Sequence, residues 1–246
     1  MKRLVCAVLL ALLTWPAVPA EAGEALIISG AEDSIIHDFI FEEVLREAYA
    51  RAGLTVGRTL LPGVRSLRSS NGGETDGEMG RVAGIEDRYP NLVRVPVVVM
   101  RTEIVAFALR ATEVWAPGGW GDLLPYEVAI PRAILIIEKR ALEHGLNFRK
   151  LDTVDQMMRT LLKGRYQVAV TDKYKALVTL AGLRREGVSV DAIEMLSPPL
   201  ITVNLYHYLH RKNFRLLPRL TKALEAMEGE GIIEARIGVF VRRLTR

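Results

Sequence analysis

The chain has 246 residues, half of them apolar, and a formal net charge of +4 at pH 7. A chain of this length and composition can bury one large core or two smaller ones, which argues against a disordered protein. The charge balance is too mild to indicate nucleic-acid binding, because that function needs clustered Lys and Arg interleaved with stacking aromatic residues.

Residues 1–22 form a predicted secretory signal peptide. Lys2 and Arg3 precede an apolar run over residues 4–13, and Ala20-Glu21-Ala22 fits a small-residue cleavage pattern before Gly23. The run is too short to span a bilayer as a stable helix, and a retained membrane anchor is the alternative. We therefore expect a periplasmic protein whose exported chain starts at residue 23.

Cys6 is the only cysteine, and it lies inside the predicted signal peptide. The exported chain is therefore expected to have no disulfide, no thiolate metal site and no cysteine nucleophile. Removing two cations and one anion with the signal peptide lowers its net charge to +3.

After Gly23, strand-like and helix-like patterns alternate. Residues 25–29 are predicted to form a buried strand, and residues 34–53 a helix that stops at a glycine. Residues 54–61 are a second predicted strand, and Pro62 opens a short helix. This β-α-β-α order predicts a parallel sheet faced by helices.

The rest of the chain repeats the alternation. Further strands are predicted over residues 92–100, 103–109, 126–130, 166–170, 192–196 and 200–209. Further helices are predicted over residues 132–144 and 171–183, and another follows a capping box at residues 153–156. Two more helices close the chain, and the second of them starts near Gly231. The pattern favours an α/β protein of two lobes with a cleft between them.

A glycine-rich acidic stretch, SNGGETDGEMGRV, covers residues 70–82. It does not fit an EF-hand, because the twelfth position counted from Glu74 is Ile85 rather than a bidentate Glu. It also lacks the Lys-Ser/Thr of a P-loop, and its acids would repel a phosphate. A solvated turn or the lip of a ligand pocket remain as interpretations, and no metal or cofactor is predicted.

The four histidines do not form a recognisable catalytic motif. His37 and His144 lie in predicted helices, whereas His207 and His210 lie in or just after a predicted strand. The chain has no G-x-S-x-G and no H-E-x-x-H motif. We expect structural, hydrogen-bonded histidines and assign no catalytic residue.

Several motifs, in this order, resemble a known family. They are RSL at 65–67, DGE..RV.GIE..YPNL.RVP at 76–96, LLKGRYQVAVTDKYKAL at 161–177, LYHYLH at 205–210 and PRLTKALEAMEGEGIIEARIG at 218–238. Together they resemble the bacterial extracellular solute-binding proteins of family 3, and the resemblance covers essentially the whole exported chain.

The resemblance implies a type 2 periplasmic-binding-protein fold. Each lobe would be a mixed sheet flanked by helices, and two hinge strands would join the lobes. Lobe 1 would comprise residues 23–109 and 203–246, and lobe 2 residues 110–202. A ligand would bind between the lobes, which close on it.

The resemblance also implies candidate ligand-binding residues. Arg81 or Arg101 would hold a ligand carboxylate through a guanidinium fork, and Glu78 would face the ligand beside Arg81. Arg132 would lie near a helix N-terminus in lobe 2. Asp172 follows a strand where the family places an acid against the ligand's ammonium group, and a helix N-cap is its alternative role.

Some residues depart from the family pattern. The Ser-x-Thr-x-x-Arg context of the binding arginine is absent, Ala133-Ile134 stands where the family has Gly-Thr, and residues 29–36 lack an aromatic residue. These departures point away from a standard α-amino acid and toward an unspecified small polar solute.

Three functional classes follow from the resemblance. The first is a monomeric receptor that delivers a small polar solute to an ABC-type permease. The second is a sensing module that passes its conformational change to a signalling partner. The third is an enzyme of the cyclohexadienyl dehydratase type, in which Glu78 or Asp172 would be the acid or base. Neither binding role requires a cofactor.

Overall fold

The computed structural model describes residues 25–244 except 33, 113, 115, 116 and 133. The predicted signal peptide lies outside these residues. Within them, no helix is both long and apolar enough to cross a membrane.

Strands and helices alternate along the chain. The strands are β1 (Leu26–Ala31), β2 (Val56–Leu61), β3 (Gly77–Arg81), β4 (Leu92–Leu109), β5 (Val128–Pro131), β6 (Phe148–Leu151), β7 (Val168–Asp172), β8 (Ile193–Met195) and β9 (Ile201–His210). The longer helices are α1 (Ile35–Phe39) continued by η1 (Ile40–Leu45) and α2 (Arg46–Arg51), then α3 (Gly63–Gly72), α4 (Leu135–Glu143), α5 (Val154–Leu162), α6 (Lys173–Arg185), α7 (Leu217–Gly229) and α8 (Ile232–Leu244). Short helical turns are η2 (Ile85–Asp87), η3 (Arg110–Thr112), η4 (Trp120–Leu123) and η5 (Arg211–Leu216).

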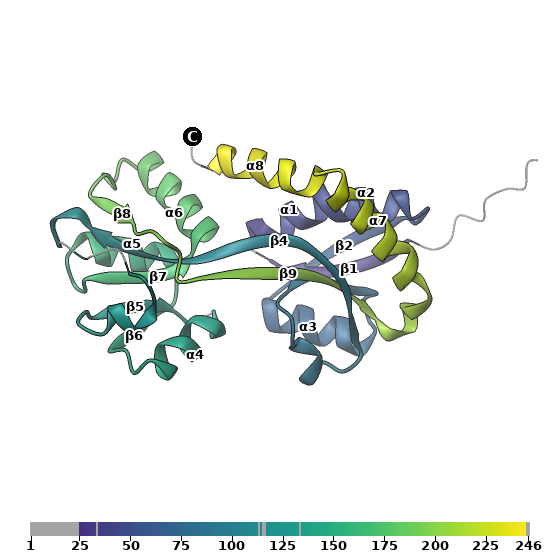
Figure 1. Ribbon diagram of the computed structural model, residues 1–246, viewed down its shortest axis with the longest axis horizontal. Helices are drawn as coiled ribbons and strands as arrows, with labels where there is room; N and C mark the ends of the chain where they lie inside the picture. Colours follow the sequence, from purple (N-terminus) through teal and green to yellow (C-terminus); the bar gives the residue numbers. More distant parts are fainter. Residues whose placement is uncertain (1–24, 33, 113, 115–116, 133, 245–246) are drawn as a thin grey trace, which may run out of the picture.

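The molecule has two lobes joined by the long strands β4 and β9 (Figure 1). The strand order is β2-β1-β3-β9-β4-β7-β5-β6, and β8 pairs with β4. Within each lobe, β1 pairs in parallel with β2 and β3, and β5 pairs in parallel with β6 and β7. The antiparallel pair of β4 and β9 connects these two parallel sets.

Separate hydrophobic cores support the two lobes. The core of lobe 1 lies under α1, η1, α2, α7 and α8, and it includes the side chains of Val95 to Met100 that point inward from β4. In lobe 2, one core packs with α4 and η4 and another with α5 and α6. Both cores of lobe 2 take side chains from residues 104–108 of β4. The strand therefore changes lobe between Met100 and Ile104.

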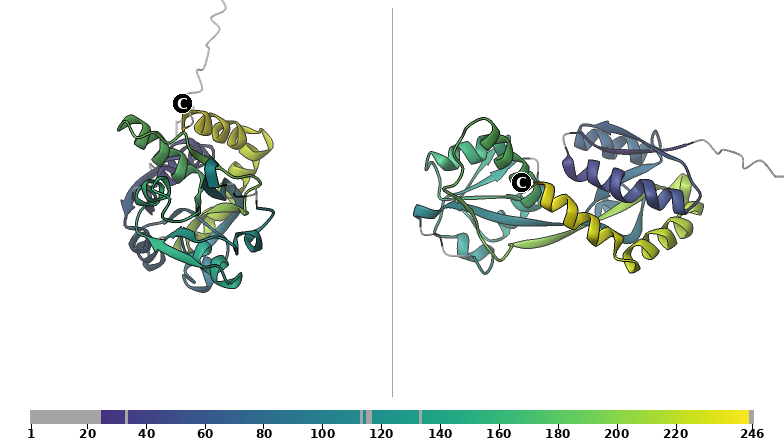
Figure 2. Two further views of the ribbon diagram at one scale, coloured as in Figure 1. Left: turned by 90° about the vertical axis from the view of Figure 1, so that its left-hand side faces the viewer. Right: turned by 90° about the horizontal axis from the view of Figure 1, so that it is seen from above.

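Helix α8 crosses from lobe 1 toward lobe 2. Viewed from above, it runs over the gap between the lobes and ends beside α6 (Figure 2). Phe240 on α8 contacts both Phe39 of α1 and Tyr174 of α6, with ring centroids 4.6 and 5.6 Å apart. The lobes are thus connected by a helix as well as by the two strands.

The largest local difference from the sequence prediction concerns residues 77–81. This part of the glycine-rich stretch is the buried strand β3, not a solvated turn. A Cβ at Gly77 would lie 2.2 Å from the backbone oxygen of Tyr208 on the neighbouring strand. A second glycine, Gly80, leaves room for the side chain of Ile40. These glycines allow close packing, although glycine is disfavoured in strands by its intrinsic propensity.

Candidate functional site

Three of the candidate site residues, Arg81, Arg132 and Asp172, lie at the carboxyl ends of parallel strands, whereas Glu78 lies near the start of β3. Glu78 and Arg81 belong to β3, Arg132 follows β5, and Asp172 is the last residue of β7. In open α/β sheets, ligands bind beyond the carboxyl ends of the strands. The topology therefore places polar groups of each lobe at the sheet edge where ligands bind in this class of fold.

Glu78 is fully buried, and hydroxyl groups surround its carboxylate. Its Oε2 accepts hydrogen bonds from Ser66 at 2.6 Å and from Ser29 at 2.9 Å, with Ser70 farther away at 3.4 Å. Two of these serines come from α3, so this helix covers the sheet with a polar face rather than an apolar one. A buried carboxylate requires such partners, because an unpaired buried charge is strongly unfavourable.

Arg81 completes the shell around Glu78. Its Nε and Nη2 lie 2.8 and 2.6 Å from Oε1 of Glu78, and Nη2 also donates to the backbone oxygen of Gly63 at 3.2 Å. Among the described residues, none accepts a hydrogen bond from Nη1 of Arg81. The guanidinium therefore keeps donors available for a ligand, while Glu78 balances its positive charge.

His37 links the ends of β1 and β3 beside this ion pair. Its Nδ1 accepts a hydrogen bond from the backbone N–H of Ala31 at 2.6 Å, and its Nε2 donates to the backbone oxygen of Gly80 at 3.0 Å. Burial, reinforced by the nearby Arg81, lowers the pKa of His37 to about 3. His37 is therefore a neutral structural residue, as the sequence predicted.

Asp172 closes the end of β7 in lobe 2. One carboxyl oxygen accepts from the backbone N–H of Lys175 at 3.0 Å, so Asp172 is the N-cap of α6. The other oxygen accepts from the hydroxyl of Thr102 on β4. Burial raises the pKa of this carboxyl group. The capping alternative is therefore observed, and Asp172 also ties β7 to a strand that joins the lobes.

The other cations near the strand ends of lobe 2 are also paired. Arg132 binds Asp152 at 2.8 Å, and both side chains are largely exposed. Lys173, the first residue of α6, binds Glu103 of β4 at 2.7 Å. Each of these cations, like Arg81, thus has a carboxylate beside it. Ala133, next to Arg132, lies outside the described residues.

Arg101 stands apart from the other candidates. It lies on β4, and its exposed guanidinium faces Glu234 of α8 at 3.5 Å. The structure therefore brings Glu78 and Arg81 together and places Arg101 against α8.

Several residues of the site were not identified from the sequence. Ser29, Ser66 and Thr102 bind the two buried carboxylates, but isolated hydroxyl residues carry no motif. The only usable signal was the position of Ser29 at the end of a predicted strand. Among the described residues, no group of three or more His, Cys, Asp or Glu side chains is placed to hold a metal ion.

Comparison with known proteins gives a sequence relative and several structural neighbours. No family model matches the chain. An uncharacterized protein of Shewanella oneidensis is 24% identical over 226 residues, which are 89% of this chain and 83% of that protein.

The structural neighbours share the two-lobed fold at low sequence identity. A histidine kinase sensor domain with similarity to periplasmic binding proteins has a TM-score of 0.69 at 18% identity, covering 88% of this chain and 96% of that one. An ancestral cationic amino acid solute-binding protein has a TM-score of 0.65 at 17% identity, covering 86% and 93%. A mutant of ArgBP from T. maritima has a TM-score of 0.63 at 15% identity, covering 87% and 93%. The chain therefore has the two-lobed fold of periplasmic binding proteins.

Proposed function

We propose that this protein is a periplasmic solute-binding protein that captures a small polar solute between its lobes. The Glu78–Arg81 pair carries this proposal, because it joins the buried carboxylate of Glu78 to the partly exposed guanidinium of Arg81, the last residue of β3, which retains free donors. Periplasmic location and export by residues 1–22 are part of the proposal, and so is the division into lobe 1 (23–109 and 203–246) and lobe 2 (110–202). The packing of β4 favours a hinge near residues 101–103, so residues 104–108 pack with lobe 2 although this division counts them in lobe 1.

The paired charges indicate the kind of solute. Arg81, Arg132 and Lys173 each have a carboxylate partner, so the strand ends carry little net charge. Such a site favours a ligand with several hydrogen-bond acceptors over a strongly charged ion, since an anion would compete with Glu78 for Arg81. A small polar solute fits this arrangement.

The same geometry favours binding over catalysis. Glu78 and Asp172 are the candidates for an acid or base, and hydrogen bonds engage both oxygens of each carboxyl group. A general base must instead reach a proton of the substrate. We therefore propose no enzymatic activity of the dehydratase type.

Transport and sensing use the same binding event and differ in the partner. A transport receptor delivers the solute to an ABC-type permease, and a sensing module passes lobe closure to a signalling protein. The sensor domain among the structural neighbours supports sensing, and the ancestral cationic amino acid solute-binding protein among them supports delivery. We propose a monomer for either role.

A thermal-shift screen of residues 23–246 tests the proposal. The panel contains amino acids, opines, polyamines, organic acids and small sugars, because a ligand that binds only the folded state raises the Tm. We expect one chemical class to raise the Tm. A panel without any shift contradicts the proposed solute receptor.

Arg81→Lys tests the residue that carries the proposal. Lysine keeps the charge and loses the planar fork, so we expect the solute found in the screen to bind about tenfold more weakly, which corresponds to about 1.4 kcal/mol. Arg65→Lys, an exposed position on α3, is the matched control and is expected to leave the Kd unchanged. Equal Kd values for Arg81→Lys and the unaltered protein, measured by calorimetry, would remove Arg81 from the site.

A further inference from the structure

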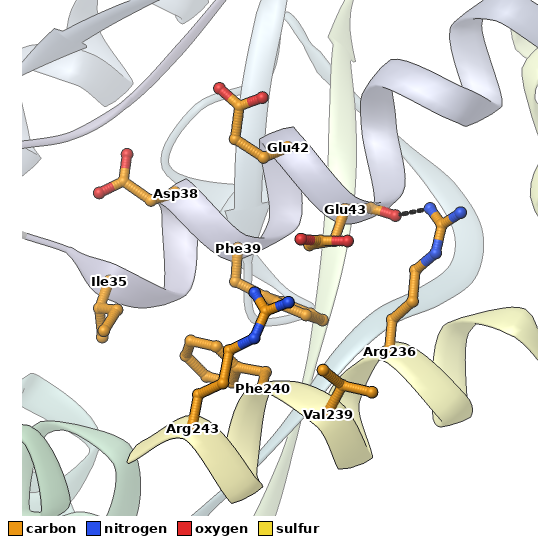
Figure 3. A pocket seen from close by; sticks show the side chains of 9 residues that line it. All are labelled: Ile35, Asp38, Phe39, Glu42, Glu43, Arg236, Val239, Phe240 and Arg243. Atoms are coloured by element: carbon orange, nitrogen blue, oxygen red, sulfur yellow. Dashed lines mark hydrogen bonds between the residues drawn. The ribbon is translucent and has the colours of Figure 1, made fainter.

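A pocket lies on lobe 1, between α1–η1 and α8 (Figure 3). Its volume is about 310 Å³, which is at the small end of the range for ligand sites. It is lined by Ile35, Asp38, Phe39, Glu42, Glu43, Arg236, Val239, Phe240 and Arg243. None of these residues belongs to the strand-end site, so the pocket is separate from the proposed solute site.

Two phenylalanine rings form an apolar surface in this pocket. The rings of Phe39 and Phe240 are 4.6 Å apart at their centroids, and Phe39 is buried. Ile35 and the exposed Val239 extend the apolar lining on opposite helices. Such a surface suits the aromatic or aliphatic part of a small ligand, because aromatic side chains contribute much of the apolar contact in binding sites.

Three of the charged lining residues already have partners. Asp38 binds Arg58 at 2.6 Å, and Glu42 binds Arg46 at 2.8 Å. In Figure 3 the carboxylates of Asp38 and Glu42 point away from the two rings. Arg236 donates to Glu47 and to the backbone oxygen of Glu43.

The two remaining charged side chains, Glu43 and Arg243, have no such partners. Among the described residues, neither the Glu43 carboxylate nor the Arg243 guanidinium has an ion pair or hydrogen bond, and the two groups are not paired with each other. They come from η1 and α8, on opposite walls, and both extend over the phenylalanine rings (Figure 3). The pocket therefore presents a separate anion and cation above an apolar surface.

We propose that this pocket binds a small zwitterion with an apolar body, in which Glu43 accepts from an ammonium group and Arg243 donates to a carboxylate. The apolar body would lie on Phe39 and Phe240. A direct Glu43–Arg243 pair is the competing use of these charges, but an exposed pair contributes only about 0–1 kcal/mol. A ligand that makes a charge-assisted hydrogen bond to each residue and covers two aromatic rings can replace that pair.

Occupation of the pocket would also act on α8. Phe240 contacts Tyr174 of α6 in lobe 2 as well as Phe39 in lobe 1. A ligand held between η1 and α8 would therefore stabilise the packing of α8, a helix that contacts both lobes.

The test uses L-phenylalanine as the probe, with amide chemical shifts of the purified protein as the readout. We expect saturable shifts at Gly238 and Val239, which lie on α8 beside the pocket. Phenethylamine lacks the carboxylate and 3-phenylpropionate lacks the ammonium group, so each should bind at least tenfold more weakly than the amino acid.

Two variants assign the charges. Glu43→Gln should weaken L-phenylalanine binding at least tenfold but leave binding of 3-phenylpropionate unchanged. Arg243→Gln should weaken L-phenylalanine equally and leave phenethylamine unchanged. Glu225→Gln and Arg165→Gln remove exposed charges elsewhere and should change neither Kd.

The outcomes separate this site from the proposed solute site. Shifts at Gly80 and Asp172 without shifts at Gly238 and Val239 would place the amino acid at the strand ends, which would overturn this inference and support the proposed function. Absence of saturable shifts at Gly238 and Val239, or binding there that neither Glu43→Gln nor Arg243→Gln weakens, would also overturn it, whatever the result of the solute screen.

Discussion

Glu78 and Arg81 meet although they are three residues apart on one strand. Alternation along a regular strand would send these side chains to opposite faces of the sheet. Glu78 pairs with Tyr208 and Arg81 with Tyr206, and the register shifts between these two positions. This irregularity interrupts the alternation of side chains between the two faces of the sheet and brings Glu78 and Arg81 to the same face. Both residues were candidates from the sequence, but their direct pairing depends on a β-bulge that no sequence pattern predicts.

The first prediction concerns removal of the Glu78 charge. Glu78→Gln leaves the partly buried Arg81 without its anion, and breaking a buried ion pair costs about 3–5 kcal/mol. We expect a loss of about 3 kcal/mol in the free energy of unfolding, at the lower end because Arg81 is partly exposed. Urea denaturation gives the value. Glu74→Gln, four residues earlier and exposed, is the control, and equal effects of the two changes would contradict the account.

The second prediction concerns pH and His207. This fully buried imidazole bonds to the hydroxyl of Tyr49 at 2.9 Å and to the backbone oxygen of Glu78 at 2.8 Å, and burial lowers its pKa to about 4. Because the unfolded imidazole has the higher pKa, it binds a proton first as the pH falls. The stabilisation is complete above pH 6.5 and is lost as the pH falls toward 4.

The measurement compares free energies of unfolding at pH 7.5 and pH 5.5. His207 alone should account for a decrease of roughly 1 kcal/mol over this range. His207→Gln removes the titrating group. The free energy of unfolding of this variant should therefore decrease by roughly 1 kcal/mol less between the two pH values than that of the unaltered protein. The same pH dependence in both proteins would show that His207 does not contribute in this way.

At the scale of elements, most strands and helices followed from local patterns. Thr153 caps α5 by accepting from the backbone N–H of Gln156 at 3.1 Å, as the capping box predicted. Strand β3 was missed because two glycines and two charged residues conceal a buried strand. The two extended segments 92–100 and 103–109 proved to be the single strand β4, since no turn separates them. Tertiary contacts, rather than propensity, decide both cases.

The third prediction uses the contrast between two glycines. Gly77→Ala places a Cβ against the backbone oxygen of Tyr208, which cannot move without disturbing β9, so we expect a loss of about 1–3 kcal/mol. Gly182 lies inside α6 with open space around it, and Gly182→Ala should stabilise by about 0.5–1 kcal/mol. Thermal and urea unfolding of both variants check the opposite signs. Stabilisation by Gly77→Ala would contradict the close approach of β3 and β9.

At the scale of the molecule, the alternating pattern was sufficient to predict two α/β lobes, and the fold confirms this architecture. The point at which β4 changes lobe could not be predicted, because residues 92–109 are apolar on both sides of the change. The contact of α8 with lobe 2 was also beyond local patterns, since Phe240 is an ordinary apolar residue of an amphipathic helix. Both features depend on how distant segments pack.

The central claim is that the lobes close on a small polar solute. Pulsed electron spin resonance between labels at Arg68→Cys on α3 and Lys139→Cys on α4 measures this directly, because both positions are exposed and Cys6 lies in the predicted signal peptide. The solute that raises the Tm in the screen should shorten the distance between the labels, and Arg81→Lys should require more solute for the same change. An unchanged distance at saturating solute would contradict capture between the lobes.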